Sequence, residues 1–273
     1  MTNRATPVIR RVRTVLGTGA LLATGALALT SCATPAASGT GSEAGPRIVA
    51  TTTQVGDFTR ELVGDTADVT QLLAAGQSAH GFDPSAAQLL ALADADALVV
   101  NGAGLESWLD DAVKASGFSG ELIDASSGIE LFATDDEHAD DGDEHDHGAG
   151  NPHIWTDPKL AEQMVENIAA GLDEVPGIDA AAVDANESTY LDKLDALDTW
   201  IEENVAAVPV EQRLLVTNHD AFTYFVDAYD ITFVGSVIPS FDDNAEPSAA
   251  EIDELVAKIR ATGVKAVFSE ASI

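Results

Sequence analysis

The six histidines of this chain are its clearest candidates for chemistry, and their spacing divides them into two groups. Three lie among the carboxylates of residues 134–150, TDDEHADDGDEHDHGAG: His138, His145 and His147. The other three lie far apart along the chain: His80, His153 and His219. Neutral imidazole is a good ligand for zinc and related divalent ions, and carboxylate oxygen completes such sites. The sequence therefore offers two candidate metal-binding regions of different kinds.

The acidic segment 134–150 has almost no apolar side chain to bury, which predicts a disordered loop. A tract rich in His and Asp binds divalent ions readily but without fixed geometry, so we predict weak metal capture by this loop. The alternative interpretation is a solvated acidic loop that has no part in metal binding.

The three separate histidines share a position relative to the predicted strands. His80 follows a strand-like run at 69–73 and precedes a helix, His219 ends another apolar run, and His153 lies in the loop sequence NPHIWTDP. Open α/β sheets place their ligands at the carboxyl ends of the strands. A single histidine at such a position is more often structural, but three at equivalent positions predict a shared metal site.

The pattern of the folded part predicts an α/β fold, because apolar strand-like runs alternate with helical patterns from residue 47 onward. We expect parallel sheets flanked by helices. An internal repeat divides this region. The sequence DPSAAQL at 83–89 is echoed by EPSAAEI at 246–252, and 51–59 pairs loosely with 215–223, both at an offset of 163 or 164 residues. Two matches at nearly one offset predict two pseudo-symmetric lobes.

Each copy of the repeat is expected to begin a helix, because a serine is followed three residues later by Gln or Glu, the pattern of a capping box. Each helix then leads into a predicted strand, at 97–100 in the first copy and at 266–268 in the second.

A single long helix is predicted between the two lobes, over residues 179–207, which contain neither Gly nor Pro. Its apolar positions follow a spacing of three or four residues: Leu191, Leu194, Leu197, Ile201 and Val205. Such a helix is about 44 Å long at 1.5 Å per residue. We therefore expect an N-terminal lobe at 47–178, a rigid linking helix, and a C-terminal lobe at 208–273.

The first 31 residues have the features of an export signal: four arginines within the first 13 residues and an apolar run at 15–29. This run is too short to span a bilayer, which takes about 20 residues. The only cysteine, Cys32, closes the string Leu-Thr-Ser-Cys, which matches a bacterial lipobox. We expect cleavage before Cys32, a lipid anchor on its thiol, and a flexible tether at 32–46.

The charge of the chain excludes some partners. All 46 Asp and Glu lie after residue 31, but only nine of the 13 Lys and Arg do, so the mature chain has a net charge near −37. Phosphate binding requires a basic surface, so we expect no nucleic-acid partner. With one cysteine, an intrachain disulfide and a thiolate metal cluster are both excluded.

Several motifs resemble those of one known family, the zinc and manganese solute-binding lipoproteins of ABC importers. HGFDPSAAQ, from His80, resembles the family pattern His-x-(Tyr/Phe)-(Glu/Asp)-Pro. NPHIWTDP resembles Asp-Pro-His-x-Trp-x-Asp-Pro, and NHDAFTYF resembles a His-Asp-Ala-Phe-x-Tyr-Phe segment. EPSAAEI and VFSEAS are similar to later segments of the family, so the resemblance covers residues 47–273.

The resemblance implies two α/β lobes joined by one long helix, with a transported metal ion held in the cleft between them. It implies that His80 and His153 come from the first lobe and His219 from the second. It also implies delivery of the ion to an ABC permease, and a location on the outer face of the cell membrane. We expect a monomer.

Two features bear on the identity of the ion. Relatives have a fourth ligand, an Asp that would fall beyond Ile273, so we expect an incomplete second lobe, with Glu270 as a candidate substitute. Manganese importers of the family often have Glu at the position of His219. Three imidazoles shift the preference toward Zn(II), the softer ion, with Mn(II) as the alternative.

Other functions remain open on the residues alone. A surface adhesin lipoprotein could store metal through the acidic loop. A zinc hydrolase could use the same three histidines and an open coordination position, with Asp220 as the general base. The chain lacks a His-Glu-x-x-His helix, so we expect a binding protein and not an enzyme.

Overall fold

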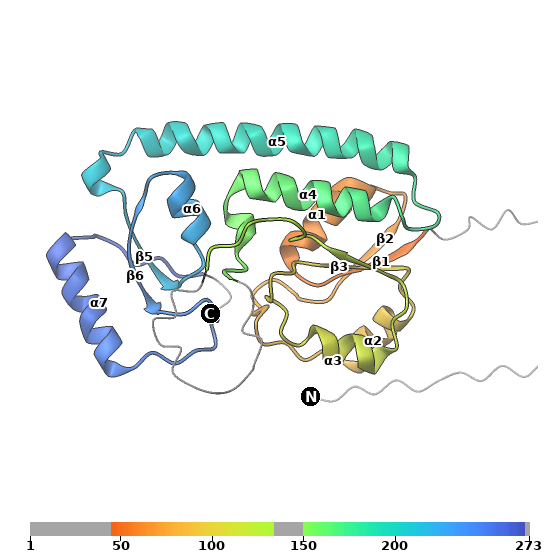
Figure 1. The fold of residues 1–273 in the computed structure, drawn as a ribbon, viewed down its shortest axis with the longest axis horizontal. Helices are drawn as coiled ribbons and strands as arrows, with labels where there is room; N and C mark the ends of the chain where they lie inside the picture. Colours follow the sequence, from red (N-terminus) through yellow and green to blue (C-terminus); the bar gives the residue numbers. More distant parts are fainter. Residues whose placement is uncertain (1–44, 134–149, 271–273) are drawn as a thin grey trace, which may run out of the picture. The chain divides into compact units, whose positions relative to one another are not determined.

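The first of two parallel sheets has the strand order β2-β1-β3-β4 (Figure 1). The computed structural model describes residues 45–133 and 150–270, which belong to one compact unit. The strands of the first sheet are β1 (Arg47–Ala50), β2 (Asp68–Gln71), β3 (Ala97–Val100) and β4 (Glu121–Asp124). All four residues of β3 are buried, as expected for a central strand that helices cover on both faces.

Helices cover both faces of this sheet. Ile48 and Ala50 of β1 face α1 (Thr53–Val63) and α4 (Pro158–Leu172), in one apolar cluster. Val49, which points to the opposite face, packs with residues of α2 (Ala86–Ala93) and α3 (Leu109–Ser116). A short 3₁₀ helix, η1 (Ile154–Thr156), precedes α4.

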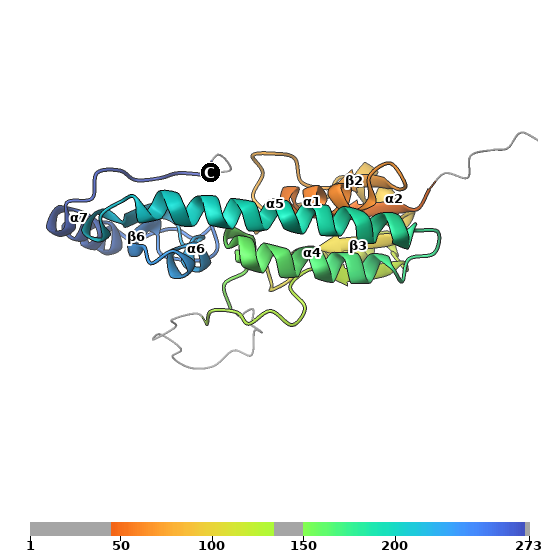
Figure 2. The ribbon, with the colours of Figure 1, turned by 90° about the horizontal axis from the view of Figure 1, so that it is seen from above.

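The linking helix α5 spans Ala180–Ala206, so the prediction of a single helix at 179–207 is confirmed within one residue at each end. It packs against α1 and α4 of the first lobe, and Figure 2 shows it running on toward the second sheet. Its buried residues, Val183 and Leu194, both lie in the part that contacts the first lobe. Leu197, which the spacing also assigned to the apolar side, is 44 % exposed. Within the described residues, no helix is long and apolar enough to cross a membrane.

The second sheet pairs β5 (Leu214–His219) with β6 (Thr232–Ile238) in parallel, after the short helix η2 (Val210–Gln212). The helices of this lobe are α6 (Thr223–Ala228) and α7 (Ala249–Thr262). Its small core contains Val216, Val234 and Leu255.

The prediction of a strand at 266–268 is wrong, because only an isolated bridge between Thr217 and Phe268 forms there. Phe268 N donates one hydrogen bond to Val216 O at 2.8 Å. Val267 and Phe268 are more than half exposed, so burial does not hold the segment against β5 as it holds β3 against β1.

The predicted repeat corresponds to repeated local structure. The order β2-β1-β3 of the first sheet recurs as β6, β5 and the bridge at Phe268 in the second. Ser85 starts α2 and Ser248 starts α7, each with a complete capping box. The signal segment, most of the predicted tether and residues 134–149 lie outside the described residues, so the predictions for them are not addressed by the structure, whereas Gly150 is described and buried.

Candidate metal centre

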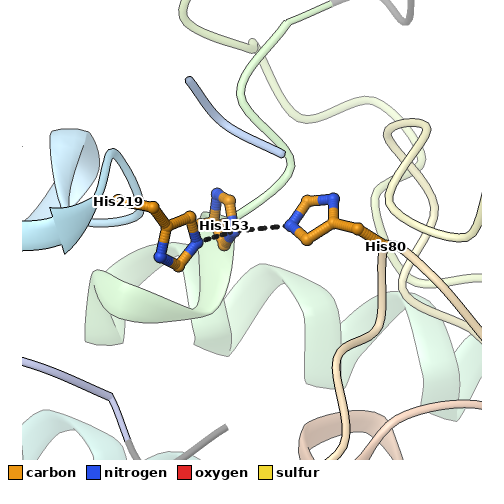
Figure 3. Close-up of side chains that lie close together, drawn as sticks. All are labelled: His80, His153 and His219. Atoms are coloured by element: carbon orange, nitrogen blue, oxygen red, sulfur yellow. Dashed lines mark hydrogen bonds between the residues drawn. The ribbon is translucent and has the colours of Figure 1, made fainter. Parts of the chain in front are cut away.

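Three segments bring their histidines to one point (Figure 3). His80 lies in the loop between β2 and α2, His153 directly precedes η1, and His219 is the last residue of β5. His153 and His219 are 2 % and 3 % exposed, and His80 is half-buried. The structure therefore gathers the three histidines that are distant in sequence.

The ring nitrogens have the spacing of metal ligands. Nε2 of His153 lies 3.2 Å from Nε2 of His80 and 3.2 Å from Nε2 of His219. A tetrahedral site with Zn–N bonds of about 2.0–2.1 Å has edges of about 3.3–3.4 Å. The three potential ligand atoms all lie within 4.8 Å of one another. The donor set and its spacing therefore fit a divalent ion with one position left open.

The amide of Asn151 fixes the orientation of His153, the central histidine of the three. The backbone N–H of His153 donates to Asn151 Oδ1 at 3.0 Å, and Asn151 Nδ2 donates to Thr223 Oγ1 at 2.9 Å and to the carbonyl of Asp220 at 3.4 Å. A backbone N–H must face an oxygen and a carbonyl must face an N–H, so this amide has one orientation. His153 Nδ1, 2.8 Å from Oδ1, is therefore the donor nitrogen, and its Nε2 keeps the lone pair for a metal.

Glu270 contacts the far side of the His219 ring. Its Oε2 lies 3.0 Å from His219 Nδ1, although the ring N–H has no aligned acceptor among the described residues. Its backbone N–H donates to Asn218 Oδ1 at 3.4 Å. Glu270 therefore lies beside Nδ1, whereas Nε2 of His219 is the nitrogen that faces His153.

The loop that carries His80 is held at several points. Ser107 Oγ donates to the carbonyl of His80 at 2.9 Å, and Trp108 Nε1 donates to that of Ala79 at 2.8 Å.

The same loop also contacts the second lobe, because Ser78 Oγ donates to Asp243 Oδ1 at 2.7 Å. Asp243 lies 163 residues after His80, at the offset of the repeat, so the repeat is the sequence signal that could have identified it.

Burial favours the neutral form of two of the three imidazoles. It lowers the pKa of His153 well below the ordinary value, and the neighbouring His80 and His219 lower it further. Burial also lowers the pKa of His80, against the opposing effect of Asp243 and Asp242. Neutral imidazole is the form that binds metal. The three histidines line a cavity of about 360 Å³ together with Trp155, Asp243 and Glu270.

The other residues singled out from the sequence are Asp220, Cys32 and the histidines of the acidic loop. The Asp220 carboxylate accepts a hydrogen bond from Thr223 Oγ1 at 2.9 Å, at the start of α6. Cys32 and the loop histidines lie outside the residues that the structure describes: His138, His145 and His147.

Comparison with known proteins shows that this chain is similar to metal-binding proteins. The family model for the zinc-uptake complex component A, periplasmic (ZnuA), matches residues 48–273. The chain is 29 % identical over 229 residues to the manganese-binding lipoprotein MntA of Halalkalibacterium halodurans, covering 84 % of this chain and 72 % of that protein. It is 30 % identical over 231 residues to the zinc-binding lipoprotein AdcA of Streptococcus pneumoniae, covering 82 % of this chain and 44 % of AdcA. The chain thus spans less than half the length of AdcA.

Solved structures have the same architecture. The crystal structure of Streptococcus pneumoniae AdcAII has a TM-score of 0.72 at 25 % identity, covering 84 % of this chain and 81 % of that one. The periplasmic zinc-binding protein TroA of Treponema pallidum also has a TM-score of 0.72 at 25 % identity, covering 84 % and 79 %. The family match over residues 48–273 agrees with the two lobes of parallel sheet joined by a long helix and with the cluster of three histidines. This chain therefore belongs to the ZnuA family of periplasmic zinc-uptake components.

Proposed function

We propose that this protein is an extracytoplasmic receptor of an ABC importer, which binds Zn(II) between its lobes and delivers it to a membrane permease. His80, His153 and His219 would hold the ion through Nε2. The observation that carries the proposal is the pair of 3.2 Å distances between these nitrogens, which match the edges of a tetrahedral zinc site. The family supplies the solute-binding component of such importers and not an enzyme.

Zinc is the ion that the donor set favours. Three nitrogens in a buried, tetrahedral arrangement suit zinc, whereas manganese prefers oxygen ligands in octahedral geometry. One similar lipoprotein is named for manganese and another for zinc, so Mn(II) is the alternative cargo. A manganese receptor predicts comparable affinities for the two ions, and a zinc receptor predicts a large preference for zinc.

The route to the membrane follows from the sequence. We propose that the thiol of Cys32 carries the lipid anchor and that residues 32–46 tether a monomeric receptor, with lobes at 47–178 and 208–273, to the outer face of the membrane. A Cys32→Ala variant should then appear in the soluble fraction of the producing cell, whereas the parent chain appears with the membranes. Residues 134–150 are proposed to capture metal weakly.

Titration of zinc into the full chain against a chelating competitor tests the metal centre. We compare the parent chain, a variant without residues 135–149, and His153→Ala. One tight site is expected in the first two proteins and none in the third. Circular dichroism of His153→Ala in the absence of metal checks that the lobes remain folded. Tight binding that disappears with residues 135–149, or that survives His153→Ala, contradicts the assignment.

A further inference from the structure

Asn151 is fully buried and uses both ends of its amide. Oδ1 accepts from the backbone N–H and from Nδ1 of His153, at 3.0 and 2.8 Å. Nδ2 donates to Thr223 Oγ1 and to the carbonyl of Asp220, at 2.9 and 3.4 Å. One side chain thus holds the ligand that comes from the first lobe and, at its other end, two residues of the second lobe.

The second-lobe partners of this amide directly follow a metal ligand. Asp220 is the neighbour of His219, and Thr223 begins α6 one turn later. The backbone of Asn151 is held from the same side, because the hydroxyl of Tyr224 donates to its carbonyl at 2.6 Å. Three hydrogen bonds, none of which involves the ion, therefore join the segments that carry His153 and His219.

A bound ion leaves only when its nitrogen ligands separate. The segment with His219 cannot move away from His153 while the Nδ2 bonds of Asn151 persist. Breaking them in a closed site would leave a buried N–H donor without an acceptor, which is costlier than the loss of an exposed bond. A carboxylate of the same shape has no N–H to donate and could not make these contacts with the carbonyl of Asp220.

We infer that Asn151 is a positioning residue that couples the second lobe to His153 and thereby sets how long the ion is retained. The inference rests on the proposed function, because it concerns the release of the same ion. It assigns to Asn151 a role in the rate of dissociation, separate from the three nitrogens that bind the metal.

The test measures zinc release from the full chain. Each protein is loaded with one equivalent of zinc and mixed rapidly with excess chelator. Tryptophan fluorescence follows release, since the Trp155 ring lies 5.2 Å from that of His153. Thr223→Val removes the acceptor and should raise the dissociation rate about three- to tenfold, the effect of one buried hydrogen bond. The association rate should change less. Thr223→Ser keeps the hydroxyl and should release zinc at the parent rate.

A second variant separates this bond from the bond between Thr223 and Asp220. Asp220→Ala removes that second bond and keeps the amide of Asn151, so Thr223→Val should still raise the dissociation rate about three- to tenfold in its background. An unchanged dissociation rate in Thr223→Val overturns the inference, and so does the absence of any acceleration by Thr223→Val in the Asp220→Ala background. A parent chain that retains no zinc at all would instead defeat the proposed function.

Discussion

Ser78 and Asp243 join the two lobes beside the three clustered histidines, where Ser78 Oγ donates to Asp243 Oδ1 at 2.7 Å across 165 residues of sequence. Both residues line the cavity that contains the histidines. Asp243 also acts on His80 by its charge, because it raises the pKa of that imidazole against the stronger effect of burial. One residue of the second lobe thus both lines the cavity and adds negative charge beside His80.

The charge of Asp243 should contribute to zinc affinity. Asp243→Asn retains an oxygen for Ser78 but removes the charge, and we expect a loss of roughly fivefold, since a partly exposed charge contributes up to about 1 kcal/mol. The loss should shrink at high salt, which screens the interaction. Chelator competition at low and high salt measures it. Asp192→Asn, on an exposed part of α5, is the control. An effect of Asp243→Asn no larger than that of the control would refute this role.

Zinc affinity should depend on pH only in the acid range. Burial lowers the pKa of His153 well below the ordinary value of 6.5, so protons compete with zinc at this ring only at lower pH. Because the folded protein disfavours the charged form, the apparent affinity should stay level from about pH 8 down to about 6.5 and then decrease. Competition titrations across this range test it. A steep decrease between pH 8 and 7 would mean that a group other than His153 controls binding.

Two leucines of α5, three residues apart, should differ in their effect on stability. Leu194 is 7 % exposed and belongs to the core of the first lobe, whereas Leu197 is 44 % exposed. Leu194→Ala should lower the free energy of unfolding by about 2–4 kcal/mol through lost burial and a residual cavity. Leu197→Ala should cost less than about 1 kcal/mol. Urea denaturation of the two variants compares these values, and equal costs would show that α5 is not held asymmetrically.

Two glycines with positive φ provide a similar contrast. A Cβ on Gly102, at φ 78°, would lie 1.9 Å from Asp124 Oδ1, whereas one on Gly117, at φ 71°, would have no atom within 4 Å. Gly117→Ala should cost only the left-handed strain of about 1–2 kcal/mol. Gly102→Ala adds a clash with a side chain that is hydrogen-bonded to Ser126, so it should cost at least about 2 kcal/mol more. Thermal or urea unfolding ranks the two variants, and the reverse ranking would contradict the structure.

Local patterns in the sequence predicted the elements that local interactions form. The capping boxes at Ser85 and Ser248 depend on residues three positions apart, and both are present. The helix at 179–207 depends on a continuous spacing of apolar residues without Gly or Pro. The segment 266–268 has the same apolar character as 97–100, but only Phe268 pairs with β5 and its side chain stays exposed, and a short window of sequence does not report burial.

The candidate site was predictable in part for the same reason. His80, His153 and His219 could be grouped by their positions after strands and by the resemblance of their motifs. The bonds that orient them depend on tertiary packing: Asn151 reaches Thr223 over 72 residues, and Ser78 reaches Asp243 over 165. Of these residues, only Asp243 could have been identified from the sequence, because it lies one repeat offset after His80. Nothing in the spacing of Asn151 indicated that its amide faces two lobes at once.

The asymmetric burial of α5 has a mechanical consequence. Its buried residues lie at or before Leu194, and beyond this point its bonds to neighbouring elements include those that Asp195 and Asp198 make with Lys159 and Tyr229. The first part of α5 is therefore fixed to the core of the first lobe, whereas its C-terminal part, to which the second lobe is attached, is not. The helix contains no Gly or Pro, so we expect it to be stiff along its length. Amide hydrogens of the fixed part should exchange only when the first lobe unfolds, and those of the last turns should exchange by fraying. The length of α5 therefore sets the distance between the core of the first lobe and the start of the second lobe. The contacts around the three histidines then hold the second lobe in position.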